Sequence, residues 1–329
     1  MKHNERNTLF KSWIENSIDA PIRRIETASS DASFRSYYRV ILHNENSYIA
    51  VDSPPEHENN KSFIRIAKIL DGMKIPVPRI IDYELNHGFF IVSDLGKTTM
   101  LMRLRENMNL SSDFYTRAVT LISKMQNSEV SSYTELPLYD KGLMLDEMKL
   151  FIDWYCKFEL KVNDEEIQKY DLYSIFNQIA DRTYDQEKVF VHRDFHSRNI
   201  MINTNNQLGL LDFQDAVIGP ITYDLVSLLR DCYISLPEPF ILEKIKQFHQ
   251  ETTSSLIKTT HEDFLKDFDL MGVQRHLKAI GIFSRLKHRD KKENYILDIP
   301  RTRSYLERTC NKYEFLQSLS NFLRKYSHP

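Results

Sequence analysis

Residues 189–215 read VFVHRDFHSRNIMINTNNQLGLLDFQD, and this stretch decides the fold. It opens with the apolar run VFV (189–191), which is typical of a short buried strand. A second apolar run (200–202), a polar turn (203–207) and a third apolar run (208–211) follow, and this pattern predicts a β-hairpin. We expect the hairpin to bring Asp194, Asn199 and Asp212 to one point.

Carboxylate and amide oxygens at this spacing suit phosphoryl transfer. Mg²⁺ takes oxygen ligands at about 2.0–2.1 Å, and Asn199 and Asp212 are the predicted metal ligands. Asp194 would accept the proton of an attacking hydroxyl, a layout that protein kinases use. The alternative is that Asp194 caps a turn and Asn199 lies at a strand edge. We expect His192 to brace the loop rather than carry a proton, and Arg193 to form either a surface ion pair or an active-site charge.

The composition of the 329 residues fits one large or two modest globular domains. A formal net charge of −2 provides no basic field for nucleic acid or an acidic membrane. Three scattered cysteines argue against a disulfide framework or a zinc site. No leader-like segment and no run of about 20 apolar residues is found, so we expect a cytoplasmic protein. The eight glycines form neither GxxxxGK[ST] nor GxGxxG, which excludes Walker-type and dinucleotide-binding folds.

Hydrophobic periodicity predicts an α+β protein with a small, mainly antiparallel β lobe (1–95) and a large, mainly helical lobe (96–329), with a cleft between them. In the first lobe we expect a helix before Pro21, strands at 22–26, 34–43, 48–52, 80–84 and 89–93, a turn at 27–33, and a helix around 63–72. In the second lobe, besides the hairpin, we expect helices at 98–107, 111–128, 142–161, 165–184, 221–233, 238–254, 262–288 and 302–325.

Two motifs resemble the aminoglycoside phosphotransferase/choline kinase family, whose members have a bilobal protein-kinase-like fold. HRDFHSRN (192–199) is similar to the family's catalytic loop, and LDF (211–213) to the strand end that binds metal. Protein kinases carry a lysine where this chain has His196. A narrower resemblance, to the bacterial anomeric kinases of cell-wall recycling, runs over most of the chain. It is carried by DASFR (31–35), DSPPE (52–56), DFQDAV (212–217), GP (219–220), YDL (223–225), LRDCY (229–233) and QRHLK (274–278).

The narrower resemblance implies a kinase that phosphorylates the C1 hydroxyl of N-acetylmuramate or N-acetylglucosamine in peptidoglycan recycling. It implies ATP and Mg²⁺ as cofactors and a small amino sugar as the partner, with no nucleic acid and no membrane. The nucleotide-binding N-lobe would place loop 29–35 over the phosphates and residues 93–95 at the adenine. The cofactor-binding residues that follow are Ser30, Ala32, Ser33, Phe34, Arg35, Ser93, Asp94 and Leu95.

One position departs from the wider fold. The strand at 48–53 has no lysine to hold the nucleotide's phosphates, and Asp52 stands near the place where one is expected. Either Mg²⁺ neutralises more of the charge or another cation takes this role. Among the nearby cations Arg35, Arg39, Lys61 and Arg65, we favour Arg35 or Lys61.

The acceptor is expected to lie in the C-lobe beside the catalytic loop. The predicted substrate-binding residues are Asp194, His196, Arg198, Gln214, Asp215, Arg230, Asp231 and Arg275. This mixture of charges suits a sugar with hydroxyls and a carboxylate, since arginine pairs well with carboxylates. We predict that Arg230 or Arg275 contacts the lactate carboxylate of N-acetylmuramate, although Arg230 could instead pair with Asp224 or Asp231. Asp224 itself is expected to brace the catalytic loop.

Other functions remain open at this stage. A kinase of another small acceptor, of the aminoglycoside, choline or homoserine type, would carry the same catalytic loop. A nucleotide-binding pseudokinase that acts as a scaffold is the alternative from a different class, and a protein kinase is the third.

Overall fold

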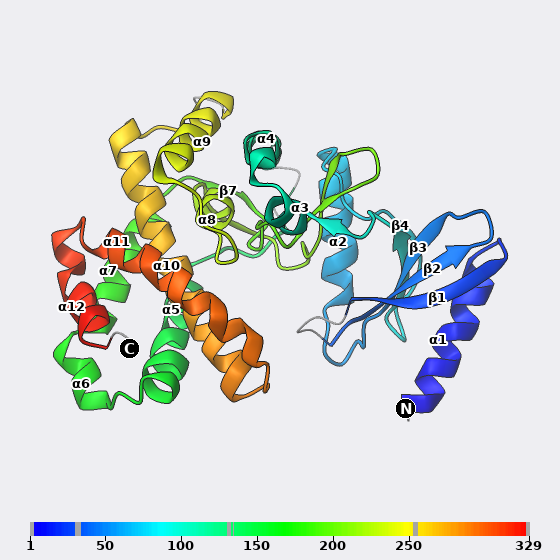
Figure 1. The fold of residues 1–329 in the computed structure, drawn as a ribbon, viewed down its shortest axis with the longest axis horizontal. Helices are drawn as coiled ribbons and strands as arrows, with labels where there is room; N and C mark the ends of the chain where they lie inside the picture. Colours follow the sequence, from blue (N-terminus) through cyan, green and yellow to red (C-terminus); the bar gives the residue numbers. More distant parts are fainter. Residues whose placement is uncertain (1–2, 30–33, 130–132, 134, 253–255, 327–329) are drawn as a thin grey trace. The chain divides into compact units, whose positions relative to one another are not determined.

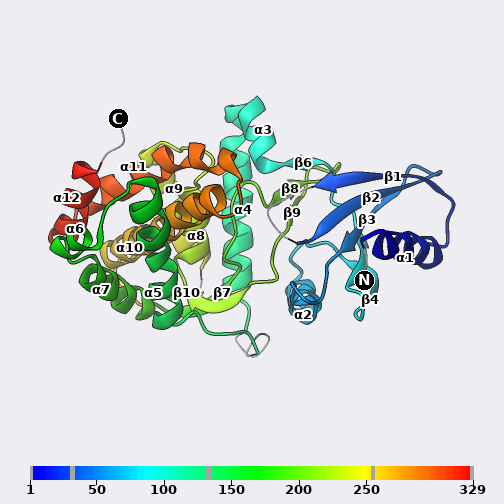
Figure 2. The same cartoon turned by 90° about the horizontal axis from the view of Figure 1, so that it is seen from below.

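The computed structural model describes residues 3–29, 34–129, 133, 135–252 and 256–326 (Figures 1 and 2). The chain forms two compact units. The first comprises Met1–Arg103 and Asn199–Asp215, and the second comprises Leu104–Arg198 and Ala216–Pro329. The central hairpin therefore packs with the N-terminal segment, although the rest of the surrounding sequence belongs to the second unit. The functional lobe boundary expected after residue 95 stays a prediction.

The first unit contains a five-stranded antiparallel sheet in the order β1-β2-β3-β5-β4. Its strands are β1 (Ile22–Ser29), β2 (Ser36–Leu42), β3 (Ser47–Asp52), β4 (Ile80–Glu84) and β5 (Phe89–Ser93). The last two match the expected ranges. The turn expected at 27–33 is wrong at its start, because β1 continues to Ser29 and pairs with β2 at Tyr37; residues 30–33 lie outside the described part.

Two helices cover this sheet because its side chains alternate between two faces. Helix α1 (His3–Ser17) ends before Pro21 as predicted, and its Phe10 packs with Ala50 and Phe89. Helix α2 (Asn60–Gly72) contributes Ile64 to a second cluster with Val51, the residue after Ala50. Successive residues of β3 thus belong to separate cores.

The predicted hairpin is confirmed as β8 (Ile200–Ile202) and β9 (Leu208–Leu210), joined to β6 (Thr98–Thr99) in a three-stranded sheet. The amide of Leu210 donates to the carbonyl of Pro76 at 2.8 Å. The ring of Phe213 stacks on Phe63 of α2 with centroids 5.0 Å apart. These contacts fix the hairpin's ends within the first unit.

The second unit is mainly helical and is arranged around α10 (His261–His288). This helix packs against several elements of the unit: α5 (Lys141–Leu150), η3 (Phe151–Glu159), α7 (Leu172–Tyr184), α8 (Tyr223–Leu229), η4 (Glu293–Asp298) and α11 (Ile299–Cys310). The remaining helices are α3 (Met100–Glu106), η1 (Met108–Leu110), α4 (Ser111–Gln126), α6 (Asp164–Lys169), α9 (Glu238–Glu251), η5 (Glu314–Leu316) and α12 (Gln317–Lys325). Strands β7 (Lys188–Val191) and β10 (Val217–Pro220) form an antiparallel pair.

Several predicted helices have different bounds. The helix expected at 165–184 is two helices, α6 and α7, because Asp171 adopts a left-handed φ of 47° between them. The helix expected at 302–325 is also two, α11 and α12. Residues 142–161 continue from α5 into a π-helical segment, η3. Helix α8 is shorter than the predicted 221–233, and the prediction at 98–107 begins with strand β6. Among the described helices, none has the length and apolar character required to cross a bilayer.

Candidate active site

The hairpin brings the two predicted metal ligands together. Asn199 precedes β8 and Asp212 follows β9, and their side chains meet at 3.4 Å between Asn199 Nδ2 and Asp212 Oδ2. Gln214 Nε2 donates to the other carboxylate oxygen of Asp212 at 2.7 Å. Asp212 has a left-handed φ of 62°, a backbone conformation that costs energy for a residue other than glycine and is often found at functional sites.

This pair fits a magnesium ion. Mg²⁺ prefers a carboxylate or two, with its other oxygens coming from phosphates and water. Asp212 is exposed and supplies the carboxylate. In the structure the amide nitrogen of Asn199 faces Asp212, so a rotation of the amide would bring its carbonyl oxygen to the same metal. The two side chains therefore offer the predicted oxygen donors on one edge of the hairpin.

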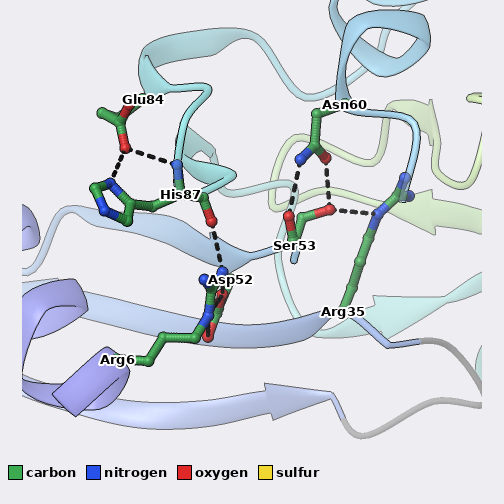
Figure 3. A network of polar contacts seen from close by, with 7 residues as sticks. All are labelled: Arg6, Arg35, Asp52, Ser53, Asn60, Glu84 and His87. Atoms are coloured by element: carbon green, nitrogen blue, oxygen red, sulfur yellow. Dashed lines mark hydrogen bonds and ion pairs between the residues drawn. The ribbon is translucent and has the colours of Figure 1, made fainter. Parts of the chain in front are cut away.

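A polar network orders Arg35 in the same unit (Figure 3). Arg35 Nε donates to Ser53 Oγ at 3.2 Å, and Ser53 in turn donates to Asn60 at 2.6 Å. The guanidinium of Arg35 also pairs with Glu58 at 3.0 Å and lies over the Phe63 ring. Arg35 is thus a buried cation beside the start of α2, whereas Lys61 is exposed.

Asp52, which stands near the place where a lysine is expected, has a separate partner. Its carboxylate accepts hydrogen bonds from Arg6 of α1, and Arg6 also donates to the carbonyl of His87 at 2.5 Å (Figure 3). Glu84 accepts from the His87 backbone amide at 2.9 Å and also contacts the His87 ring. Arg6 therefore ties α1 to the end of β3 and to the β4–β5 turn, a contact that no motif in the sequence revealed.

The other predicted nucleotide contacts have mixed surroundings. Ser30, Ala32 and Ser33 lie outside the described residues. Phe34 is exposed and stacks on His57, with ring centroids 4.2 Å apart. The remaining three predicted residues, Ser93, Asp94 and Leu95, lie at the end of β5 and just after it in the first unit.

Asp94 in that segment is an internal brace. Its carboxylate accepts from Arg39 at 2.5 Å and from Ser47 Oγ at 2.7 Å, and it also accepts from the Gly96 amide. Burial raises the pKa of Asp94, but these bonds outweigh it and hold the pKa below its ordinary value. Ser93 Oγ accepts from the Arg79 amide. The side chain of Leu95 lies against Gly209 of β9.

The loop that carries Asp194 lies in the second unit and is held by Asp224. The two carboxylate oxygens of Asp224 accept from the backbone amides of His192 and Arg193 at 2.7 and 3.0 Å. The predicted bracing role of Asp224 is therefore confirmed. His192 is fully buried with its ring edge-on to Phe195, as expected of a structural histidine. Arg193 pairs with the buried Glu147 rather than with a surface carboxylate.

Asp194 lines an open-mouthed cavity in the second unit, which has about 500 Å³ of space when the solvent at its mouth is included. The cavity is lined by Asp194, His196, Ser227, Cys232, Tyr233, Arg275, Lys278, Ala279, Ile282 and Phe283. Burial raises the pKa of the Asp194 carboxyl, but the cations Lys278, Arg275 and Arg193 outweigh burial and hold it below its ordinary value. Asp194 is therefore ionised at neutral pH and can accept a proton.

Three polar atoms in this cavity wall lack protein partners. Within the described residues, His196 Nδ1, Ser227 Oγ and Arg275 Nε are buried and have no hydrogen-bond partner. Buried polar groups in native proteins are nearly always hydrogen-bonded, so such exceptions call for a ligand or water. Burial lowers the pKa of His196 and keeps its ring neutral, so one ring nitrogen can donate and the other accept. The cavity therefore suits a ligand rich in hydroxyl groups.

A buried polar cluster around Glu147 holds Lys278, one of the residues that line the cavity. Glu147 accepts from Lys278 at 2.8 Å and from Gln274 at 3.1 Å, and it also contacts Arg193 and the hydroxyl of Tyr139. Glu147 lies in α5, while Gln274 and Lys278 lie in α10. Sequence reasoning missed Glu147, and the motif QRHLK (274–278) was the one signal that pointed toward its partners.

The remaining predicted acceptor residues have the following places. Arg230 is buried and pairs with Asp269 at 2.5 Å, instead of with Asp224 or Asp231. Asp231 accepts from the amide and hydroxyl of Ser197. Arg198 lies over the rings of Tyr233 and Tyr295. Gln214 and Asp215 belong to the first unit, at the end of the hairpin segment.

Comparison with known proteins identifies the family. Residues 24–256 match the model of the Phosphotransferase enzyme family. The chain is 38% identical over 307 residues to the N-acetylmuramate/N-acetylglucosamine kinase of Pseudomonas aeruginosa. The matched region covers 93% of this chain and 89% of that protein. It is 32% identical over 317 residues to the enzyme of the same name from Neisseria meningitidis, covering 96% and 94%.

A solved structure shows the same fold. The GDP complex of wild-type aminoglycoside 2'-phosphotransferase-IIIa superposes with a TM-score of 0.63 at 15% identity, covering 95% of this chain and all of that one. The predicted fold class, an antiparallel β N-terminal part and a mainly helical C-terminal part of the protein-kinase-like type, is thereby confirmed.

Proposed function

Because the chain belongs to the Phosphotransferase enzyme family, we propose that it transfers the γ-phosphoryl group of ATP to the C1 hydroxyl of N-acetylmuramate, N-acetylglucosamine or both. The names of relatives that match nearly the whole chain support this acceptor. The single structural observation that carries the proposal is the cavity beside Asp194, whose wall holds unpartnered polar atoms of His196, Ser227 and Arg275. We assign the activity to cytoplasmic recycling of cell-wall sugars; the three cysteines, all buried and free, agree with a reducing compartment.

Asp194 is the proposed general base. Its carboxylate is held ionised by the surrounding cations, and its loop is fixed by Asp224, so that it can take the proton of a hydroxyl bound in the cavity. A hemiacetal hydroxyl is more acidic than an ordinary alcohol, which suits a weakly basic carboxylate. His196 and Ser227 would orient the sugar by hydrogen bonds to neighbouring hydroxyls. Positioning of this kind supplies most of the acceleration in phosphoryl transfer.

Asn199 and Asp212 are the proposed ligands of Mg²⁺, which when bound neutralises charge on the nucleotide's phosphates. Their chain positions agree with a joint role, since Asn199 follows Asp194 by five residues. We expect Asp212→Ala to abolish magnesium-dependent turnover. A base of the Asp194 type is worth about 10²–10⁴-fold in rate, and we expect Asp194→Ala to lie at the low end because the acceptor is acidic.

Arg35 is the proposed substitute for the missing strand lysine. It lies over Phe63, which stacks on Phe213, the residue after Asp212. Burial raises the pKa of the nearby Tyr37, and the charges of Arg35 and Asp212 both act on this same hydroxyl. Arg35 therefore lies on the side of the first unit that carries the proposed metal ligands.

Substitution by methionine tests this assignment against Lys61. We expect Arg35→Met to weaken ATP binding, measured by calorimetry, by roughly tenfold or more, which is the effect of losing a charged hydrogen bond. Lys61→Met is the matched control, because Lys61 is exposed near the same helix start. Equal ATP affinity of Arg35→Met and wild type would refute the role of Arg35.

A substrate panel tests the function itself. Purified protein with ATP and Mg²⁺ is offered N-acetylmuramate, N-acetylglucosamine, an aminoglycoside, choline and homoserine, and ADP release is recorded. Phosphate on C1 of an amino sugar, seen by phosphorus NMR, is the expected result. If only choline or the aminoglycoside is phosphorylated, the proposed amino-sugar acceptor is wrong and that compound is the acceptor class instead. ATP binding without turnover of any acceptor would favour a scaffold and contradict the proposal.

The cavity disfavours an aminoglycoside. These antibiotics are polycations, and Arg275 and Lys278 place positive charge in the cavity wall. Unfavourable like charges are an effective means of rejecting a ligand. The likeness to an aminoglycoside phosphotransferase therefore shows the fold, whereas the charges of this cavity favour a neutral or anionic acceptor.

A further inference from the structure

Helix α10 contributes a row of side chains to the wall of the acceptor cavity, and this row is cationic at one end and apolar at the other. Arg275, Lys278, Ala279, Ile282 and Phe283 all line the cavity, and their spacing places them on one face of the helix. The row is cationic at the end that includes Arg275 and Lys278 and apolar at the other. The same cavity contains Asp194, so the cationic end belongs to the site that holds the reacting hydroxyl.

Arg275 is a buried cation that makes no direct hydrogen bond or ion pair with the described residues, although its charge interacts with those of Asp194 and Asp231. Its side chain is 8% exposed. Its guanidinium lies over the ring of Tyr223, which holds the plane of the group in place. Since Nε and the Nη atoms are all uncommitted, the edge of the guanidinium can bind a carboxylate through two parallel hydrogen bonds.

Lys278 lies one turn further along α10, lines the same cavity and is held in place by two acceptors. Its ammonium donates to Glu147 at 2.8 Å and to the hydroxyl of Tyr223 at 3.1 Å. An ammonium has three N–H donors. Within the described residues these two acceptors leave one donor of Lys278 for the cavity. Tyr223 thus contacts both cations and sets their spacing.

We propose that Arg275 and Lys278 form a carboxylate subsite in the acceptor cavity, so that an N-acetylated sugar bearing a carboxylate, N-acetylmuramate, is preferred over the neutral N-acetylglucosamine. This inference rests on the proposed function. The apolar end of the row provides a surface for the methyl groups of such a ligand. Arg230, the other candidate, is already paired with Asp269 and does not contribute to the cavity lining given by the described residues.

A neutral analogue tests the subsite in the wild-type protein. N-acetylmuramate, its methyl amide, in which the carboxylate is neutral, and N-acetylglucosamine are compared by kcat/KM with ATP and Mg²⁺. We expect the acid to exceed its methyl amide by roughly tenfold to a hundredfold, the range for hydrogen bonds to a charged group. Equal values for the acid and the amide would overturn the subsite without any mutagenesis.

Variants then assign the residues. Arg275→Met and Lys278→Met should each reduce the ratio of acid to amide toward one, mainly through KM of the acid, and Arg275→Lys should restore part of it. Lys287→Met is the matched control, because Lys287 is a cation of the same helix whose partner is Glu159. Calorimetric binding of the acid and thermal unfolding confirm that each variant is folded.

The remaining outcomes separate the subsite from the proposed function. If the variants lower turnover of all three acceptors by the same factor, the two cations act on the transferred phosphoryl group or on Asp194, and the subsite is wrong. If the wild type phosphorylates neither amino sugar, the proposed function fails and the subsite fails with it. If the variants phosphorylate both amino sugars and keep the wild-type ratio of kcat/KM for the acid to that for the methyl amide, the subsite is refuted while the proposed function stands.

Discussion

Glu147→Gln should destabilise the second unit through the two cations that Glu147 holds. Burial raises the pKa of Glu147, but Lys278 and Arg193 outweigh burial and lower it from 4.5 to about 2. This difference corresponds to about 3 kcal/mol in the free energy of unfolding. A similar value, ~3 kcal/mol or more, is expected when one partner of a buried ion pair is removed. Glutamine keeps the shape of the side chain and removes the charge.

The stability difference between wild type and Glu147→Gln should depend on pH in a defined direction. Because the pKa is lower in the folded state, the stabilisation is fully present above pH 4.5 and is lost as the pH falls toward 2. The difference between wild type and Glu147→Gln should therefore be constant from pH 7 to pH 5 and shrink below pH 4.5. Urea unfolding followed by tryptophan fluorescence measures it. Trp13 lies in the first unit and Trp154 in the second, so a Trp13→Phe background reports on the second unit alone.

Glu166→Gln is the matched control. Glu166 also has a pKa lowered to about 2, by bonds from Lys169 and Lys325, but its side chain lies nearer the surface, 24% exposed against 8% for Glu147, and its lysine partners are exposed. Ion pairs near the surface contribute little to stability. Its removal should cost far less than that of Glu147. Equal losses for the two variants, or a loss at Glu147 that persists unchanged at pH 3.5, would refute the reasoning that burial makes the Glu147 pairs strong.

Three glycine substitutions test close packing. In Gly88→Ala the added Cβ would lie 1.9 Å from the carbonyl oxygen of Ser53 at a φ of +71°, so we expect a loss of about 1–3 kcal/mol or more in the first unit, measured by Trp13 fluorescence. In Gly281→Ala the Cβ would lie 2.4 Å from the carbonyl carbon of Leu150, and a similar loss in the second unit should appear in urea unfolding. In Gly72→Ala the added Cβ would meet nothing within 4 Å, so this variant of the first unit should be neutral or stabilised by up to about 1 kcal/mol, again by Trp13 fluorescence. A loss of stability in Gly72→Ala would show that lack of space is not the cause of these effects.

Local sequence patterns predicted the helices and strands whose formation depends on neighbouring residues. The hairpin followed from two apolar runs and a polar turn, and β4 and β5 were found by the same pattern. The split between α6 and α7 could not be found this way, because the break at Asp171 contains neither glycine nor proline. The π-helical segment η3 was also missed, since its residues have the apolar spacing of an ordinary helix.

The contacts that position the site were beyond local patterns. Periodicity shows that a side chain is buried but does not name its partner. Arg6 meets Asp52 across 46 residues, and Glu147 meets Gln274 across 127. The pairing of Asn199 with Asp212 was predictable because a short hairpin joins them, whereas that of Glu147 depends on the packing of α5 against α10.

The alternation of side chains along β3 accounts for both the missing lysine and its proposed substitute. Asp52 is the last residue of β3 and Ser53 follows it, and their side chains have partners on opposite faces of the sheet. Asp52 faces α1 and is neutralised there by Arg6, whereas Ser53 faces the start of α2, where it binds Asn60 and orders Arg35 (Figure 3). A lysine at position 52 would therefore point toward α1, away from the face that carries Arg35. The proposed cation lies just before the adjacent strand instead: Arg35 directly precedes Ser36, which pairs with Asp52 in the sheet.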